Sequence, residues 1–94
     1  MNARELTLNI AVNLGRLSRW AMEGKSARLD QFLKETEDYV DKLDNTPKSK
    51  QFQPTFDLFQ KSFIKIKSRV SMDKEWAEDT LTWANILTHR AKLA

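Results

Sequence analysis

The sequence predicts an all-α protein that folds as an antiparallel up-and-down four-helix bundle. Apolar residues recur at spacings of three and four in four separate segments, and most of the connections between these segments are short. The chain has only two glycines and two prolines, which is few for a turn-rich β protein. Its 94 residues fit one domain, residues 1–94. A three-helix core, with the remaining helix packed on a partner, is the alternative.

The first predicted helix spans residues 2–22. Asn2 with Glu5 three residues later has the form of a capping box, in which each group satisfies free amides of the first turn. Gly24 can adopt the left-handed conformation that ends many helices. The apolar stripe of this helix consists of Ala3, Leu6, Ile10, Leu14, Leu17 and Ala21.

The second predicted helix spans residues 26–43, and we expect the Ser26 hydroxyl to cap its start. One face of this helix is charged. The other face is apolar and consists of Leu29, Phe32, Leu33, Thr36, Tyr39, Val40 and Leu43. The polar stretch 44–53 that follows contains a turn and breaks the periodicity.

The third predicted helix spans residues 54–70, because Pro54 suits a first helical turn. Its apolar stripe is Phe56, Phe59, Phe63, Ile66 and Val70, and Phe52 continues this register upstream. The fourth spans residues 73–92, with Ser71 or Asp73 as its cap. Its stripe is Trp76, Ala77, Thr80, Trp83, Ala84, Leu87 and Ala91.

Charge is separated into blocks along the chain. Residues 1–25 and 47–70 are net basic, whereas residues 26–46 and 71–94 are net acidic. In an antiparallel bundle, the basic third helix lies beside the acidic second and fourth helices, which favours pairing between neighbours. The alternative interpretation is a site for the phosphates of a nucleic acid. Its residues would be Lys48, Lys50, Lys61, Lys65 and Arg69, the last three of which recur every fourth position.

The composition excludes most catalytic chemistry. The chain has no cysteine, and therefore no disulfide, thiolate zinc site or thiol nucleophile. Its one histidine, His89, has no carboxylate three or four residues away that could complete a metal site. The acid pairs Glu37 with Asp41 and Glu75 with Asp79 are more typical of solvated helix faces than of metal or acid–base sites. We therefore predict no enzyme activity, no cofactor and no metal.

Some apolar side chains fall away from the predicted core stripes. Leu8 and Val12 lie nearly opposite the stripe of the first helix, and Gly15 continues this second face. Ile86 and Leu93 lie away from the stripe of the fourth helix. Trp20, at the edge of its stripe, either covers the end of the bundle or anchors a partner. If the first and last helices are neighbours, the predicted protein interface is Leu8, Val12, Trp20, Ile86 and Leu93.

The leading hypothesis is a small non-catalytic interaction module, such as an adaptor, a regulator or an assembly subunit. Its partner would be another protein or a second copy of the chain, giving a homodimer. The alternative is an accessory protein that binds nucleic acid through residues 48–69. No apolar run approaches the ~18 residues of a membrane span, so we expect a cytoplasmic protein with no membrane partner. No family motif emerges from the residues.

Overall fold

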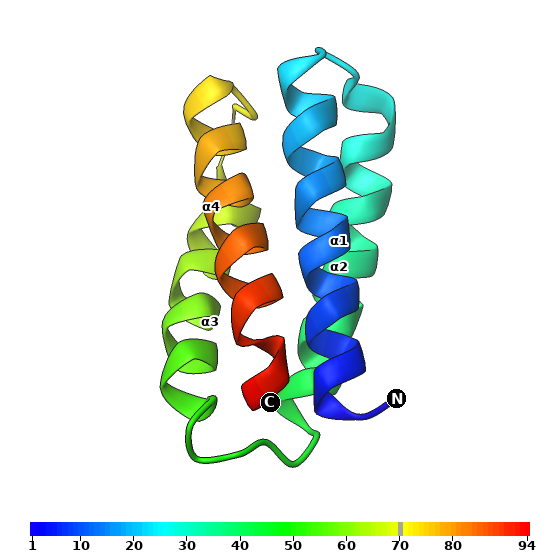
Figure 1. The fold of residues 1–94 in the computed structure, drawn as a ribbon. Helices are drawn as coiled ribbons and strands as arrows, with labels where there is room; N and C mark the ends of the chain where they lie inside the picture. Colours follow the sequence, from blue (N-terminus) through cyan, green and yellow to red (C-terminus); the bar gives the residue numbers. More distant parts are fainter. Residues whose placement is uncertain (70) are drawn as a thin grey trace.

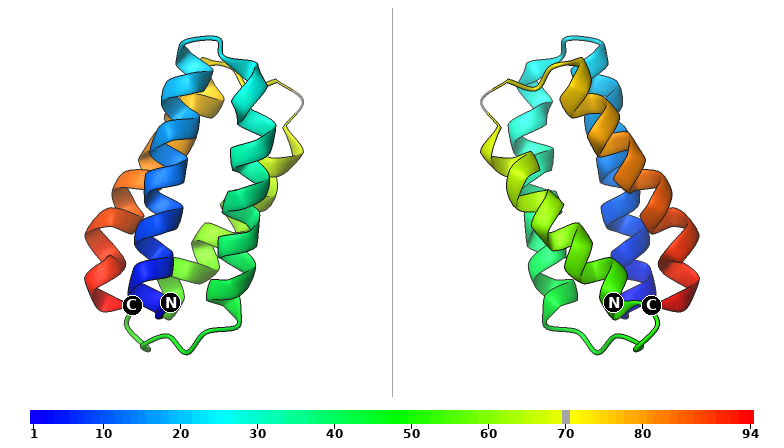
Figure 2. Two further views of the ribbon diagram at one scale, coloured as in Figure 1. Left: turned by 90° about the vertical axis from the view of Figure 1, so that its right-hand side faces the viewer. Right: turned by 90° about the vertical axis from the view of Figure 1, so that its left-hand side faces the viewer.

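The computed structural model describes residues 1–69 and 71–94 and confirms the predicted four-helix bundle (Figure 1). Successive helices run in opposite directions, and both chain termini lie at the same end of the bundle (Figures 1 and 2). α1 packs most extensively against α4 and also against α2, while α3 packs against α4. The helices are α1 (Ala3–Met22), α2 (Leu29–Asp44), α3 (Gln53–Ser68) and α4 (Lys74–Arg90).

Both ends of α1 follow the predicted signals. The Asn2 side chain accepts a hydrogen bond from the Glu5 amide at 2.8 Å. Gly24 has a φ of 71°, and the amides of Gly24 and Lys25 donate to carbonyls in the last turn of α1. This is the Schellman arrangement, in which a left-handed residue lets the chain turn back on the helix end.

The second and fourth predicted helices are each shortened by a 3₁₀ turn. Ser26–Arg28 forms the first of these turns, and α2 begins at Leu29 without a side-chain cap, so the expected Ser26 cap is wrong. Because Ser26 lies two residues after the left-handed Gly24, the chain is still reversing direction at this point. Ala91–Leu93 forms the second turn after α4, an i→i+3 tightening that is common at helix ends.

The connection between α3 and α4 is longer than the sequence predicts. α3 ends at Ser68, and Arg69 is extended, with a ψ of 134°. Val70, the predicted last residue of the third stripe, lies outside the described residues. Asp73, rather than Ser71, caps α4, because its Oδ1 accepts from the Trp76 amide at 3.0 Å.

The core is built from the predicted stripes. Phe59 lies at its centre, with its ring 5.4 Å from the rings of both Phe63 and Trp83. The Trp76 indole is fully buried and donates from Nε1 to the Ile66 carbonyl at 3.0 Å, which ties α4 to the last turn of α3. The largest fully buried apolar side chains are Leu6, Ile10, Leu14, Leu17, Leu43, Phe52, Phe56, Phe59, Trp76 and Leu87.

The contact between α1 and α4 uses small side chains that the predicted stripe of α1 omitted. Thr7, Ala11 and Ser18 are all buried on this side of α1. The Ser18 hydroxyl donates to the Ala77 carbonyl of α4 at 2.7 Å. Small residues at a helix contact let the two backbones approach closely, so α1 is buried on the α4 side as well as toward the core.

Candidate functional site

Two residues of the predicted interface, Leu8 and Val12, are exposed on the outer side of α1. Leu8 is 38% exposed and Val12 is 51% exposed. They belong to a series with spacings of four, three, four and three, which keeps its members on one side of a helix. We call this series the outer stripe; it consists of Leu8, Val12, Gly15, Arg19 and Met22.

A large apolar side chain of α4 flanks the outer stripe. Leu81 is 47% exposed and lies one turn after Ala77, whose carbonyl accepts from Ser18 of α1. Among the described residues, seven large hydrophobic side chains are exposed, and Leu8, Val12, Met22 and Leu81 are four of them. More than half of the exposed large apolar residues therefore lie on or beside one helix face.

Gly15 interrupts the outer stripe without any need imposed by the fold. A Cβ atom built at Gly15 would meet no heavy atom within 4 Å, and its φ is not in the left-handed region. Glycine in a helix interior costs about 0.5–1 kcal/mol relative to alanine. Nothing in the described chain offsets this cost, and Gly15 leaves a gap between Val12 and Arg19 on the surface.

The structure does not bring the other three predicted interface residues to this stripe. Trp20 is buried; its ring centroid lies 4.8 Å from that of Phe32 and 5.8 Å from the Arg28 guanidinium. Leu93 packs against the core, and its carbonyl accepts from the Ser49 hydroxyl. Trp20 therefore joins α1 to α2, and Leu93 closes the end of the bundle.

Ile86 lies on another side of α4. It is partly buried and follows Thr82 and Trp83 by one turn. Both of these residues line a hollow between α3 and α4, whereas α1 lies beside Ala77. The structure therefore does not join Ile86 to Leu8 in one patch, because a residue opposite its own core stripe need not lie near the neighbouring helix.

Lys48, a residue of the alternative nucleic-acid site, is hydrogen-bonded to the end of α2. The Lys48 Nζ donates to the carbonyls of Leu43, Asp44 and Thr46 at 2.7, 3.2 and 2.8 Å. It also lies 4.8 Å from the centroid of the Phe56 ring. A lysine beyond a helix end commonly satisfies the free carbonyls of the last turn in this way, so this ammonium group is already used within the fold.

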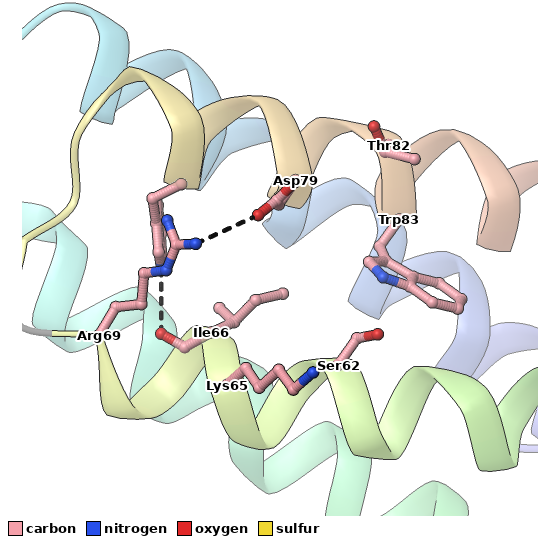
Figure 3. A pocket seen from close by; sticks show the side chains of 8 residues that line it. Ser62, Lys65, Ile66, Arg69, Asp79, Thr82 and Trp83 are labelled. Carbon is pink, nitrogen blue, oxygen red and sulfur yellow. Dashed lines mark hydrogen bonds and ion pairs between the residues drawn. The ribbon is translucent and has the colours of Figure 1, made fainter.

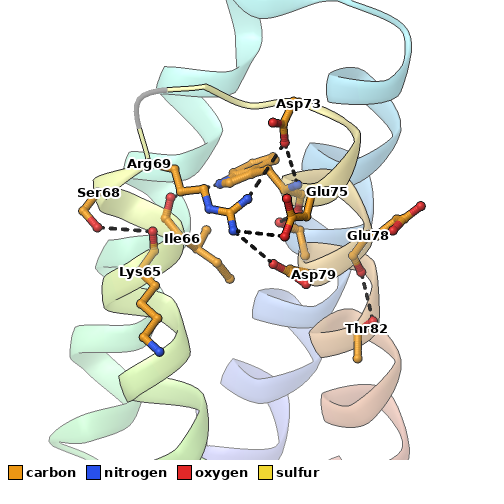
Figure 4. A network of polar contacts seen from close by, with 11 residues as sticks. Lys65, Ile66, Ser68, Arg69, Asp73, Glu75, Glu78, Asp79 and Thr82 are labelled. Carbon is orange, nitrogen blue, oxygen red and sulfur yellow. Dashed lines mark hydrogen bonds and ion pairs between the residues drawn. The ribbon is translucent and has the colours of Figure 1, made fainter.

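Arg69 is surrounded by carboxylates of the α4 N-terminal region (Figure 4). Its guanidinium lies 3.9 Å from Asp73, 3.8 Å from Glu75 and 3.7 Å from Asp79. Lys67 forms a further ion pair with Glu37 of α2 at 3.5 Å. The basic end of α3 therefore pairs with both acidic neighbours, as the charge blocks predict.

Lys50, Lys61 and Lys65 are the remaining residues of the alternative site, and all three are exposed. Lys65 borders the hollow between α3 and α4, which has a volume of about 270 Å³ and is also lined by Ser62, Asp79 and Trp83 (Figure 3). The carboxylate of Asp79 faces Arg69 across this hollow. Binding of nucleic acid stays a prediction, and no observation favours it over pairing within the bundle.

Three of the four residues in the candidate acid pairs are likewise used in ion pairing. Glu37 faces Lys67, and both Glu75 and Asp79 face Arg69. His89 is exposed near the end of α4. Within residues 1–69 and 71–94, no three histidine, cysteine, aspartate or glutamate side chains are grouped so that they could hold a metal ion. The absence of enzyme activity stays a prediction.

None of the described helices combines the length and the apolar character that a membrane crossing requires. Comparison of the chain with protein-family models, with curated proteins and with solved structures yields no significant match.

Proposed function

We propose that the chain is a non-catalytic protein-interaction module that binds its partner through the outer stripe of α1. The observation that carries this proposal is the exposure of Leu8, Val12 and Met22 on one face of a helix whose other sides are already packed. Exposed apolar side chains that lie together and are surrounded by polar residues are typical of protein interfaces.

The charged residues around the stripe support a protein partner. Arg4, Glu5, Arg16 and Arg19 are exposed, and none of them forms an ion pair within the described chain. An apolar centre with a charged rim is the usual anatomy of a protein interface. The proposal covers an adaptor, a regulator or an assembly subunit, each of which needs such a surface.

Site-specific photo-crosslinking in cells tests this proposal. Benzoylphenylalanine at Val12 is compared with the same residue at Leu58, which is 60% exposed on α3 and is the matched apolar control. We expect a discrete adduct of higher mass from position 12 and none from position 58. Adducts of equal yield from both positions, or no discrete adduct from position 12, would contradict the proposal.

A further inference from the structure

We infer that the partner of the outer stripe is a second copy of this chain, bound with the two α1 helices antiparallel. This inference rests on the proposed function, and it names the partner. The stripe repeats with spacings of four and three residues, which is the pattern of a seam between two packed helices. No other element of the described chain crosses this side of α1 (Figures 1 and 2).

The outer stripe is complementary to itself in shape. Val12 projects from it with half of its surface exposed, and Gly15, one turn later, leaves open space where a side chain would stand. When two α1 helices pack antiparallel around residues 12–15, Val12 of each copy meets Gly15 of the other. A two-fold axis produces two identical contacts of this kind, which explains why a projecting residue and a gap occur on the same stripe.

The charges select the antiparallel direction. Glu5 lies on the N-terminal side of Leu8, and Arg19 lies on the C-terminal side of Gly15. The antiparallel register brings Glu5 of one copy within about one helical turn of Arg19 of the other. A parallel pairing would instead place Arg19 against Arg19 and Glu5 against Glu5, and like charges at such positions repel.

A dissimilar partner is less well supported by the surface. A stripe that fits a different protein needs no match between its own two ends. Here Val12 fits the gap at Gly15, and Glu5 comes within about one helical turn of Arg19, under the same two-fold rotation. Such self-complementarity is the property of an isologous interface.

Sedimentation equilibrium of the purified full chain tests the inference at micromolar to sub-millimolar concentrations. We expect a species with twice the 11.0 kDa mass of one chain. Val12→Asp places a charge in the seam, and Gly15→Leu fills the gap that accepts Val12, so both variants should sediment as monomers. Leu58→Asp is the matched control and should still dimerise. Far-UV circular dichroism verifies that each variant is folded.

Charge reversal tests the direction of the helices. Glu5→Arg alone and Arg19→Glu alone should each raise the dissociation constant about tenfold, because the symmetric dimer contains each contact twice. The double variant exchanges the two charges and should return the dissociation constant to within about threefold of the original. If the double variant dimerises more weakly than either single variant, the antiparallel register is overturned.

The outcomes separate this inference from the proposed function. A chain that remains monomeric, yet gives a discrete adduct with a different protein at Val12, overturns the second copy and leaves the interaction module standing. A dimer that is unaffected by Val12→Asp and Gly15→Leu overturns the inference in the same way. A monomer without any adduct at Val12 contradicts both.

Discussion

Lys48 provides a direct test of whether the basic segment serves the fold. We consider Lys48→Met, because methionine keeps an unbranched chain of similar length and can still lie against Phe56. The substitution removes the ammonium group that bonds three carbonyls at the end of α2. Only this polar function changes, so any loss of stability reports on the carbonyl contacts.

The expected magnitude follows from the exposure of these contacts. A hydrogen bond to a charged group contributes about 1.5–3 kcal/mol when it is well shielded. The contact of Lys48 with Asp44 is exposed, and those with Leu43 and Thr46 are only partly buried. Water therefore replaces much of what is lost, and we expect the free energy of unfolding to fall by about 1.5 kcal/mol in total. For a domain of this size, that loss corresponds to a thermal unfolding midpoint about 6–12 °C lower.

The assay is urea denaturation followed by circular dichroism, with Lys50→Met as the matched control. Lys50 is exposed, and within the described chain its side chain makes no hydrogen bond or ion pair. The control should stay within about 0.5 kcal/mol of the original chain. If Lys48→Met unfolds with the same free energy as Lys50→Met, the assignment of Lys48 to the end of α2 is refuted.

Three further substitutions test the contacts that hold α4 in place, each by urea denaturation. Trp76→Phe leaves the Ile66 carbonyl without its indole donor and opens a cavity, so it should lower the free energy of unfolding by about 2–4 kcal/mol. Trp83→Phe changes a half-buried ring with no such bond, and it should lower this free energy by less than about 1.5 kcal/mol. Ser18→Val should cost about 1–3 kcal/mol by overpacking the contact between α1 and α4. Asp73→Ala should cost about 1 kcal/mol through loss of the α4 cap. Equal losses for the two tryptophans, or a neutral effect at either of the other positions, would contradict the corresponding contact.

The sequence predicts well those helices that bury large apolar side chains on one face. Phe56, Phe59 and Phe63 repeat at helical spacing because one side of α3 faces the core, and all three are buried. The Asn2 cap and the Gly24 stop are also predictable, since each is a local solution to unpaired backbone groups. Local chemistry and one-sided burial together define most of the bundle.

The contact between α1 and α4 was not predictable in the same way. Thr7, Ala11 and Ser18 are buried there, yet small and hydroxyl-bearing side chains carry little hydrophobic signal. Their burial depends on the close approach of a helix about 60 residues away in the sequence. By contrast, Lys48 carried a usable signal, because it follows a helix end by four residues and can reach back to the last carbonyls.

The five predicted interface residues reach different surroundings for one geometrical reason. The spacing of apolar residues indicates that a side chain points away from its own helix's core stripe. Each helix of a bundle has two neighbours as well as an outer side, so such a side chain can face a neighbouring helix or solvent. Ile86 lies one turn after Thr82 and Trp83, which line the hollow between α3 and α4, and Leu93 packs against the core. Leu8 and Val12 instead reach solvent. Only the three-dimensional arrangement separates these directions.

The outer stripe is therefore the part of α1 that the fold leaves unused. α4 covers one side of this helix, α2 covers another, and the core stripe lies between them. A helix that needs no further burial is expected to present polar residues on its remaining side, yet α1 presents Leu8, Val12 and Met22 there, with Gly15 among them. Because Leu8, Val12 and Met22 are exposed, we expect substitutions at the stripe to separate association from folding. If such substitutions abolish association and leave the fold unchanged, the outer stripe is the binding surface of the protein.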